Sequence, residues 1–553
     1  MLLPLSAVAA GRNSIFPILG GELSNSAATC VADIDSVMPR MARIGLNTVL
    51  VPAYWELTEP EEGTFDFTLV DRTVWQARRH GLKVVLLWFG AWKNSMSCYA
   101  PLWFKQDVKR FPRSRTSWGK PLEIATAFSP AVLQADLRAF TALMEHLRDT
   151  DNGQNVVMIQ VENEIGMLED ARDHCDLAER AYEEGVPDGL ADYLGKHRRQ
   201  LHPWLRNRLQ PSPRNRSWKE WFGDDVYTDE IFQAYHYARY VEQLAQAARR
   251  VMPSMPLYVN AAMNSRGRKP GEYPSAGPLA HLIDLWHCAA PSIDLLAPDI
   301  YDTGFKQWAT QYALPNNRLF IPESRCCENS GVRALYAFGE HHALGFSPFA
   351  IDEAAPHATA GITEAYGLMR QLRHCRWEES AAHKWGLLFD RDDTERLIED
   401  DGLLLTCRHY FTLPWDARAT DGTPWPEGGA VVMRLARHEY LIAGSGVVVS
   451  FATTSEKQQE ERRTLGEDGF AEAGTDTASH AAATRSTDAA TGRKKQRRFS
   501  GRRIGIGSVD EVSIDEHGIH YIRRHNGDQD HQGRHARIAV GQWKILHVRL
   551  YDY

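Results

Sequence analysis

Short apolar runs alternate with amphipathic segments along the larger, N-terminal part of the chain. The most informative run is Val156–Val161, which is almost entirely apolar and leads directly into Glu162, Asn163 and Glu164. Strands that are buried on both faces of a parallel sheet have this composition. The pattern therefore predicts a strand over 156–162 with polar side chains at its carboxyl end.

Seven further apolar runs predict strands at Phe16–Leu23, Asn47–Trp55, Lys83–Gly90, Pro256–Ala262, Ile293–Tyr301, Arg318–Glu323 and Gly345–Ile351. Segments with helical spacing lie between them, at Asp33–Ile44, Val70–His80, Pro130–Arg148, Asp229–Val251, Leu279–Ala289 and Gly331–His342. Eight strands that alternate with helices indicate a (β/α)8 TIM barrel. An open doubly wound sheet is the alternative, but the first strand-to-helix turn has no glycine-rich phosphate-binding motif.

The pattern changes after Leu372, where short strand-like runs are separated by turns. These runs are Leu403–Thr406, Gly429–Leu435, Tyr440–Gly444, Val447–Phe451, Ile504–Ile506, Gly518–Arg523 and Trp543–Leu550. They predict a C-terminal all-β, sandwich-like domain. We therefore expect a barrel over 12–375 and a β-domain over 376–553.

Two segments interrupt these domains. Residues 171–221 are rich in charge and tryptophan, and we expect them to form an insertion with its own helices over the strand ends. Residues 453–503 have almost no aromatic side chains and are predicted to be largely disordered. Their basic run Arg493–Arg498 fits a solvated loop better than a nuclear signal. Asn526–Asp530 fits a tight turn better than a calcium loop, because the other ligands of an EF-hand are missing.

Composition narrows the class of protein. The chain has 553 residues, of which 43% are hydrophobic, and its net charge is −8. This mild charge predicts neither a nucleic-acid nor a membrane partner. The 16 tryptophans would suit a sugar-binding cleft as well as a core. The cysteines are scattered without a Cys-x-x-Cys zinc pattern. The N-terminus lacks the basic region of a signal peptide, which favours a cytoplasmic protein over the secreted or periplasmic alternative.

Two glutamates stand where a barrel enzyme carries its chemistry. Glu164 ends the fourth predicted strand and Glu323 ends the seventh, so their side chains should face each other across the mouth of the barrel. Two carboxylates that flank a bond are what acetal cleavage requires, because one protonates the leaving oxygen and the other supports the sugar carbon.

These residues resemble a known group of enzymes. Asn163-Glu164 on the fourth strand and Glu323 on the seventh are similar to the retaining glycoside hydrolases of clan A. Within that clan, four segments resemble glycoside hydrolase family 35, the β-galactosidases: Gly20–Leu23, Asn47–Pro60, Glu62–Phe67 and Val161–Gly166. Gly505–Glu511 and Asn526–Arg534 resemble the β-domain appended in a microbial branch of that family.

The likeness has departures around the expected sugar subsite. Glu56 stands where the family usually has asparagine, and Thr58 stands where it has histidine. Ile165 replaces the usual tyrosine, and Trp88–Trp92 replaces a Cys-Ala-Glu-Trp run. These changes bear on the specificity for galactose, with glucose or a related epimer as the reserve, and leave the carboxylate pair intact.

The resemblance implies a role for each site residue. Glu164 would be the general acid/base and Glu323 the nucleophile, with Glu328 as the rival nucleophile. Asn163 would bind the sugar 2-hydroxyl, Tyr301 would hydrogen-bond Glu323, and Glu162 would orient its neighbours. Further candidates for hydroxyl contacts are Glu22, Tyr54, Glu56, Trp88, Asn94 and Asn260.

The function that follows is a retaining exo-β-glycosidase, with β-galactosidase favoured and a carbohydrate as its only expected partner. We expect no metal and no cofactor. An endo-acting β-glucanase or mannanase of the same clan is one alternative, and a catalytically silent carbohydrate-binding protein is the other. The oligomeric state is left open.

Overall fold

The computed structural model describes residues 17–211, 213–264, 266–375, 377, 383–456, 501–525 and 533–553. The chain divides into two compact units, one of Met1–Ser330 with His341–Tyr366 and one of Gly331–Glu340 with Gly367–Tyr553. The predicted domain boundary at residue 375 falls shortly after Gly367 and stays a prediction.

The first unit contains eight parallel strand positions in the predicted order. They are β1 (Ile18–Leu19), β2 (Thr48–Tyr54), β3 (Lys83–Lys93), β6 (Val156–Asn163), β7 (Leu257–Ala262), β8 (Leu295–Ile300), the pair β9 (Phe320–Ile321) and β10 (Glu323–Ser324), and β11 (Gly345–Phe346). Six of them form a sheet in the order β10-β8-β7-β6-β3-β2, and three form a sheet in the order β1-β11-β9.

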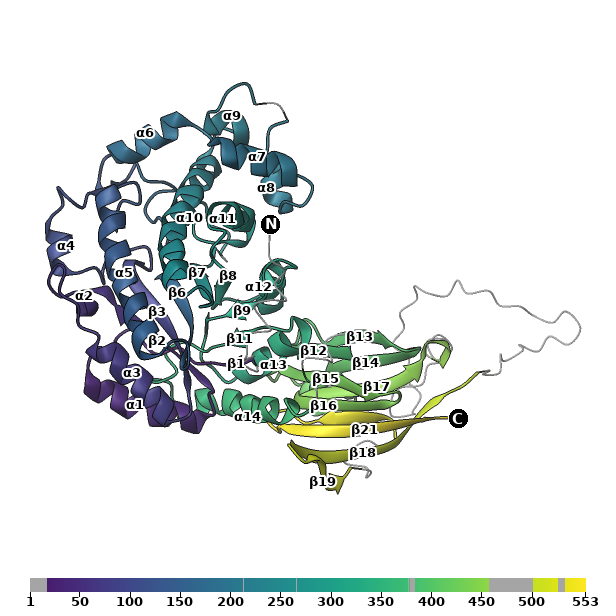
Figure 1. The fold of residues 1–553 in the computed structure, drawn as a ribbon. Helices are drawn as coiled ribbons and strands as arrows, with labels where there is room; N and C mark the ends of the chain where they lie inside the picture. The colour runs from purple at the N-terminus through teal and green to yellow at the C-terminus, as the bar shows by residue number, and fades with distance from the viewer. Residues whose placement is uncertain are drawn as a thin grey trace, which may run out of the picture. The chain divides into compact units, whose positions relative to one another are not determined.

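The two sheets close into one barrel. The seventh strand is interrupted at Pro322, which has no N–H to donate, so β9 pairs with β11 and β10 pairs with β8. On the other side, a parallel bridge between Glu22 and Leu50 joins β1 to β2. The helices lie around the outside of the strands, as α3, α5 and α10 do beside β2, β3 and β6 in Figure 1. The predicted (β/α)8 barrel is confirmed.

The main helices are α1 (Val31–Ile44), α3 (Thr68–Arg79), α5 (Pro130–Thr150), α10 (Val226–Val251), α11 (Ile283–Ala289), α12 (Phe305–Tyr312), α13 (Ser330–Glu340) and α14 (Pro356–Leu372). Helix α12 was not predicted, although its buried Phe305, Ala309 and Tyr312 have helical spacing. Helix α10 begins before the predicted Asp229, because the Asp225 carboxylate accepts the N–H groups of its first turn.

The loop after β3 holds structure that the sequence pattern missed. It contains α4 (Leu102–Gln106) and a hairpin of β4 (Arg113–Arg115) and β5 (Pro121–Ala125). Another short helix that was not predicted, α2 (Trp55–Thr58), follows β2. The segment after β6 forms the expected helices, α6 (Asp176–Glu184), α7 (Asp188–His197), α8 (Pro203–Arg208) and α9 (Trp218–Phe222). Figure 1 shows them grouped beyond one end of α10.

The second unit contains a β-sandwich. One sheet has the order β12-β15-β16-β21-β18-β19, and the other has the order β13-β14-β17-β20. Their strands are β12 (Lys384–Phe389), β13 (Glu395–Asp400), β14 (Leu403–His409), β15 (Gly428–Ala436), β16 (Glu439–Ser445), β17 (Val447–Thr453), β18 (Ile504–Asp515), β19 (Gly518–Arg524), β20 (His535–Ile538) and β21 (Lys544–Asp552). One core cluster takes buried side chains from both sheets, among them Val432 and Ile442 on one and Leu405 and Val449 on the other. The predicted all-β domain is therefore confirmed.

The ends of the predicted disordered insert are ordered, which corrects its bounds. Thr453 is the last residue of β17, and Glu456 is buried. The Glu456 carboxylate accepts from Arg503 Nε (2.6 Å) and from the Ile504 N–H (3.2 Å). Residues 457–500, with the basic run 493–498, lie outside the described residues, and so do residues 526–530.

Glu456→Ala should destabilise the β-sandwich, because it leaves the Ile504 N–H and Arg503 without this carboxylate. We expect the free energy of unfolding to fall by about 1–3 kcal/mol. Urea unfolding of the full chain, followed by the signal of the β-domain, measures the change. The control is Glu516→Ala, whose side chain is 77% exposed. Equal unfolding midpoints for the two variants would contradict the anchoring role.

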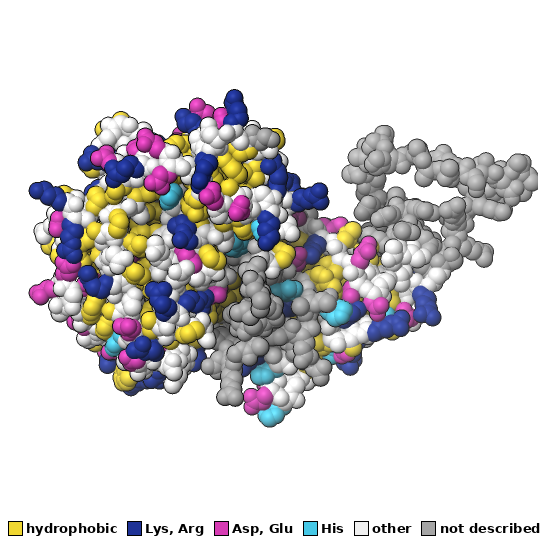
Figure 2. Space-filling view, turned by 45° about the horizontal axis from the view of Figure 1, so that its top comes forward, with side chains coloured by type: hydrophobic (Ala, Val, Ile, Leu, Met, Phe, Trp, Pro, Cys, Tyr) yellow, Lys and Arg dark blue, Asp and Glu magenta, His cyan; other side chains and the backbone are white. Residues whose placement is uncertain are grey.

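The surface of the first unit carries charges of both signs. Figure 2 shows acidic and basic side chains interspersed over its visible face. Among the described residues, no helix is both long enough and apolar enough to span a membrane. The expected lack of nucleic-acid and membrane partners stays a prediction.

Candidate active site

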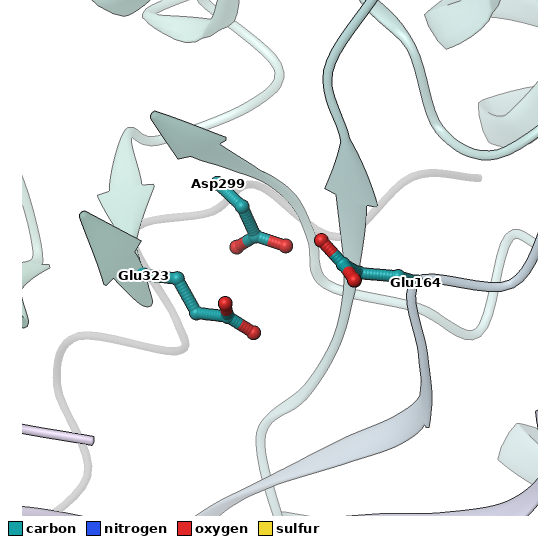
Figure 3. Close-up of side chains that lie close together, drawn as sticks. All are labelled: Glu164, Asp299 and Glu323. Carbon is teal, nitrogen blue, oxygen red and sulfur yellow. The ribbon is translucent and has the colours of Figure 1, made fainter. Parts of the chain in front are cut away.

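Three carboxylates converge at the carboxyl ends of the barrel strands. Glu164 follows the last residue of β6, Asp299 lies on β8, and Glu323 opens β10. One carboxylate oxygen from each residue lies within 4.8 Å of the chosen oxygens of the other two. Figure 3 shows the three side chains pointing toward one another from separate strands. The structure thus brings together the two predicted glutamates and adds an aspartate that the sequence analysis did not identify.

The backbone at the end of β6 is bent at two positions. Glu162 has φ 61° and Glu164 has φ 45°, both in the left-handed region that non-glycine residues seldom adopt. Such a conformation costs on the order of 1 kcal/mol per residue and persists only where the surroundings hold it. Here the Glu164 N–H donates to Asn260 Oδ1 at 2.9 Å. This bend lets Glu164 project over the barrel mouth while the neighbouring Asn163 reaches Glu323.

Glu162 belongs to a buried carboxyl pair that lies apart from the three-carboxylate cluster. Its Oε2 accepts the Trp92 N–H at 2.8 Å. Burial, together with the nearby Asp136 carboxyl, raises the pKa of Glu162 well above its usual range. Asp136 in turn accepts from Trp88 Nε1 (2.9 Å) and from the Tyr240 hydroxyl (2.8 Å). The pair ties the end of β6 to its neighbours, which fits the orienting role predicted for Glu162.

Glu323 has hydrogen-bond donors on both carboxylate oxygens. The Tyr301 hydroxyl donates to Oε2 at 2.5 Å, as the sequence predicted. The side-chain amides of Asn163 and Asn260 each donate to Oε1 at 3.4 Å. Three donors in a buried site stabilise an anionic carboxylate. One of them is shared with the neighbouring acid, because Asn260 Nδ2 also donates to Asp299 Oδ2 at 2.7 Å.

A buried lysine supplies positive charge to the cluster. Lys93, the last residue of β3, is 4% exposed. Burial lowers the pKa of its ammonium, but Glu323, Glu164 and Glu22 raise it, and the net result lies above the usual value. The lysine is therefore charged and offsets one carboxylate.

Glu164 has the electrostatics of a general acid/base. Burial, and next the charge of Glu323, raises the pKa of Glu164 to about 7, while Lys93 opposes the shift. A catalytic acid works best when its pKa lies near the working pH, because it can then both give and take a proton. The side chain is partly exposed, so it can reach a substrate.

Glu22 also interacts electrostatically with the three-carboxylate cluster. Its side chain is fully buried, and neither carboxylate oxygen has a hydrogen-bond partner among the described residues. Burial, and next the charge of Glu323, raises the pKa of Glu22 well above its usual range. A neutral acid in this place could bind a sugar hydroxyl, as predicted, but that contact stays a prediction.

Four of the predicted hydroxyl contacts lie outside the cluster. Trp88 is fully buried and packs against Phe140 of α5, which contradicts its predicted contact with a sugar. Tyr54 is also buried, and its hydroxyl accepts the N–H of Ala28 at 3.4 Å.

Glu56 and Asn94 lie near the surface. The Glu56 carboxylate is 3.8 Å from Lys105 Nζ. Asn94 is exposed, and its Oδ1 accepts from Lys93 Nζ at 2.7 Å. The rival nucleophile Glu328 is exposed in the turn before α13 and is not one of the three converging carboxylates.

Two site residues could have been found in the sequence. Asp299 is two residues before Tyr301 on the same strand, so it faces the same side. Lys93 ends a long apolar strand, as Glu164 does. Neither matches the quoted family motifs, which is why the sequence analysis passed over them.

A cleft of about 430 Å³ opens beside the cluster. Its lining is mainly polar and charged, which suits a ligand rich in hydroxyl groups. The residues are Glu164, Ala262, Met263, Asn264, Arg266, Arg268, Glu272, Tyr273, Pro274, Asp299, Tyr301, Asp302 and Arg325. None belongs to the insertion at 171–221, which was expected to lie over the strand ends. The loop after β7 supplies most of the cleft wall instead.

Three converging carboxylates also raise the question of a metal. Among the described residues, they form the group with the spacing of metal ligands. The charged Lys93 acts electrostatically on the same carboxylates and so already supplies positive charge to them. We therefore assign the cluster to acid–base chemistry and name no metal ligand.

Comparison with known families agrees with this site. Residues 30–233 match the family model described as "Beta-galactosidase", glycoside hydrolase family 42, and residues 362–537 match a domain of unknown function (DUF5597). The first match covers β2, β3 and β6, and with them Asn163 and Glu164.

Similar solved structures are also β-galactosidases. That of the Antarctic haloarchaeon Halorubrum lacusprofundi is 16% identical, with a TM-score of 0.46 over 64% of this chain and 58% of its own. That of the psychrophilic Marinomonas ef1 is 14% identical, with a TM-score of 0.46 over 66% and 61%. The chain thus spans about three fifths of their lengths. Because these TM-scores are low, the fold is assigned from the strand order described above and not from this similarity.

The family match decides one part of the sequence prediction. It supports the coarser part, a likeness to the β-galactosidases among glycoside hydrolases, over residues 30–233. The matching model is that of family 42, so this comparison does not support the finer assignment to family 35.

Proposed function

We propose that this protein is a retaining exo-β-glycosidase that removes terminal β-linked galactose. The observation that carries the proposal is the close spacing of Glu164 and Glu323, of which one carboxylate oxygen each lies within 4.8 Å of the other. Retaining glycosidases hold their two carboxyl groups about 5–5.5 Å apart, whereas inverting enzymes leave room for a water between carboxylate and sugar. The second carboxylate must then attack the sugar directly.

The described groups suggest a role for each residue in this reaction. Glu164 gives its proton to the oxygen of the leaving group while Glu323 attacks the anomeric carbon. Tyr301 holds the nucleophile in position through its hydrogen bond, and the positive charge of Lys93 helps to balance the charge of the nucleophile. Asn163, next to the acid, binds the sugar 2-hydroxyl. In the second step, Glu164 takes a proton from water, and the water releases the sugar with its original configuration.

The sugar is proposed from similarity. The β-galactosidase family model and the motifs that resemble family 35 both favour galactose. The choice between families 35 and 42 stays a prediction, because the motifs support one and the matching model supports the other. An endo-acting β-glucanase or mannanase remains the alternative, since the cleft wall is formed by a loop that could leave a groove open.

A panel of aryl β-glycosides tests the proposal. We expect the highest kcat/KM with the β-galactoside, and β-galactose as the first product seen by NMR. Oligosaccharides labelled at the reducing end should lose one sugar at a time from the other end. First release of α-galactose would contradict the retaining mechanism, and cleavage in mid-chain would favour the endo-acting alternative.

The pH dependence of kcat/KM should report the Glu164 proton. Because the acid form must protonate the leaving group, activity should fall as pH rises through about 7, the pKa of Glu164, and then by about tenfold per pH unit. In Glu164→Gln, the residual activity on an activated aryl galactoside should lack this alkaline limb. If the limb persists in that variant, another group carries the titration.

A further inference from the structure

Only one of the two carboxylate oxygens of Asp299 accepts a hydrogen bond from the described residues. The side chain is 1% exposed. Its Oδ2 accepts from Asn260 Nδ2 at 2.7 Å. Its Oδ1 is buried and has no hydrogen-bond partner among the described residues. An ionised aspartate with an unsatisfied buried oxygen is costly, so this atom needs a proton or a donor.

The two side chains that converge with Asp299 are those of carboxylic acids and not of amides. Glu164 and Glu323 bring carboxylate oxygens within 4.8 Å from β6 and β10. The other groups that interact with it electrostatically are Glu22 after β1, Lys93 on β3, Tyr258 on β7, Tyr301 directly after β8 and Tyr312 on α12. One lysine therefore faces four carboxyl groups, and most of those groups must be neutral for the charges to balance.

We infer that Asp299 is a positioning residue that stays protonated through the catalytic cycle and donates a hydrogen bond from Oδ1 to Glu164. The inference rests on the proposed function and deepens it. Asn260 fixes the other oxygen, so the proton is directed toward the acid/base. When Glu164 passes its proton to the leaving group, this hydrogen bond stabilises the carboxylate that remains. The Asp299 proton itself is not transferred.

The electrostatic environment agrees with this geometry. Burial, and then the charges of Glu323 and Glu164, raises the pKa of Asp299 well above its usual range. Asp299 in turn lowers the pKa of Glu164, against the larger effects of burial and of Glu323. A neutral donor beside Glu164 therefore helps to keep its pKa near neutral pH.

Two variants distinguish the protonated form from an ionised one. In Asp299→Asn, the amide is always neutral, can still accept from Asn260, and can donate to Glu164. We expect kcat/KM for the β-galactoside to stay within about threefold, with the alkaline limb unmoved. In Asp299→Leu, the donor is lost, so the limb should move up by about half a pH unit or more, and kcat/KM should fall by about tenfold to a hundredfold.

The sign of the shift decides between the two forms. If Asp299 were ionised, both variants would remove a negative charge and move the limb to lower pH, which would overturn the inference. A loss of rate at every pH with an unmoved limb in Asp299→Leu would also overturn it, because a packing defect alone acts that way.

A second measurement does not depend on turnover. The full chain is labelled with ¹³C at the aspartate carboxyl carbon, and its NMR spectrum is compared with that of Asp299→Asn. The signal that the substitution removes should have the chemical shift of a protonated carboxyl at pH 7. A carboxylate shift would overturn the inference. If the protonated signal is found but no β-glycoside is hydrolysed, the proposed function fails and the assignment of the Asp299 proton stands.

Discussion

Replacing Glu323 by alanine should reduce kcat on β-galactosides by on the order of 10⁵-fold, because no other group can form the covalent intermediate. Asn163, Asn260 and Tyr301 would remain to bind the sugar, so substrate affinity should change much less than the rate. Activity assays measure the change in kcat, and equilibrium binding of galactose to the variant measures the change in affinity.

Labelling of the intact enzyme tests the same residue by chemistry. A 2-deoxy-2-fluoro-β-galactosyl fluoride should inactivate the protein and add one sugar mass to the peptide that contains Glu323. The fluorine slows both steps and the fluoride leaves readily, so the intermediate accumulates. The matched control is Glu328→Ala, which removes the exposed neighbouring acid and should keep activity and labelling. A label on Glu328 would mean that the nucleophile has been assigned wrongly.

Glu164→Ala should separate substrates by their leaving groups. With a poor leaving group such as a second sugar, the loss should be about 10²–10⁴-fold, because the departing oxygen needs a proton. With an activated aryl galactoside the first step should be almost unaffected, and the slow step becomes the release of the sugar by water.

Added azide provides the positive signature of this variant. A small anion can enter the space left by the side chain and attack the glycosyl enzyme without a general base. The rate on the aryl galactoside should rise, with β-galactosyl azide as the product. Glu169→Ala serves as the control, since its side chain is half-exposed and pairs with Lys120 on the surface. Equal losses on both substrate types, without azide rescue, would remove Glu164 from the acid/base role.

The periodicity of the chain was enough to predict the barrel. Buried parallel strands need continuous apolar runs, and their covering helices need one apolar face, so both leave a local signal. Where the signal was weak, the prediction failed. The short helix α12 and the hairpin β4–β5 are set by packing and by loop hydrogen bonds, which a sequence period does not record.

The side to which a residue points was harder to predict than its strand. Trp88 and Lys93 were both near the end of the third predicted strand, but the pairing of β3 with β6 shifts its register between them. Trp88 then faces α5, and Lys93 reaches the carboxylate cluster. These two positions are five residues apart on β3, but their partners are only two residues apart on β6, so an irregular segment and not simple alternation sets where each side chain lies.

Composition also failed to predict which residues are ordered where tertiary contacts hold a single residue in place. Glu456 lies at the edge of a polar segment, and nothing local distinguishes it from its neighbours. Its order comes from Arg503 and Ile504, which are far away in the sequence. Hydrogen bonds of this kind become visible only when both segments are placed.

The sequence by itself determined the strand order and the strand ends at which Glu164 and Glu323 lie. Buried strands are recognisable as apolar runs, and their carboxyl ends as the polar residues that follow. Only the tertiary structure decided the chemistry of the site. Closure of the barrel brings Asp299, Lys93 and Glu22 to the same two glutamates, and the pKa of each acid depends on the charges that closure places around it. Electrostatic coupling acts across space, so no single strand contains it.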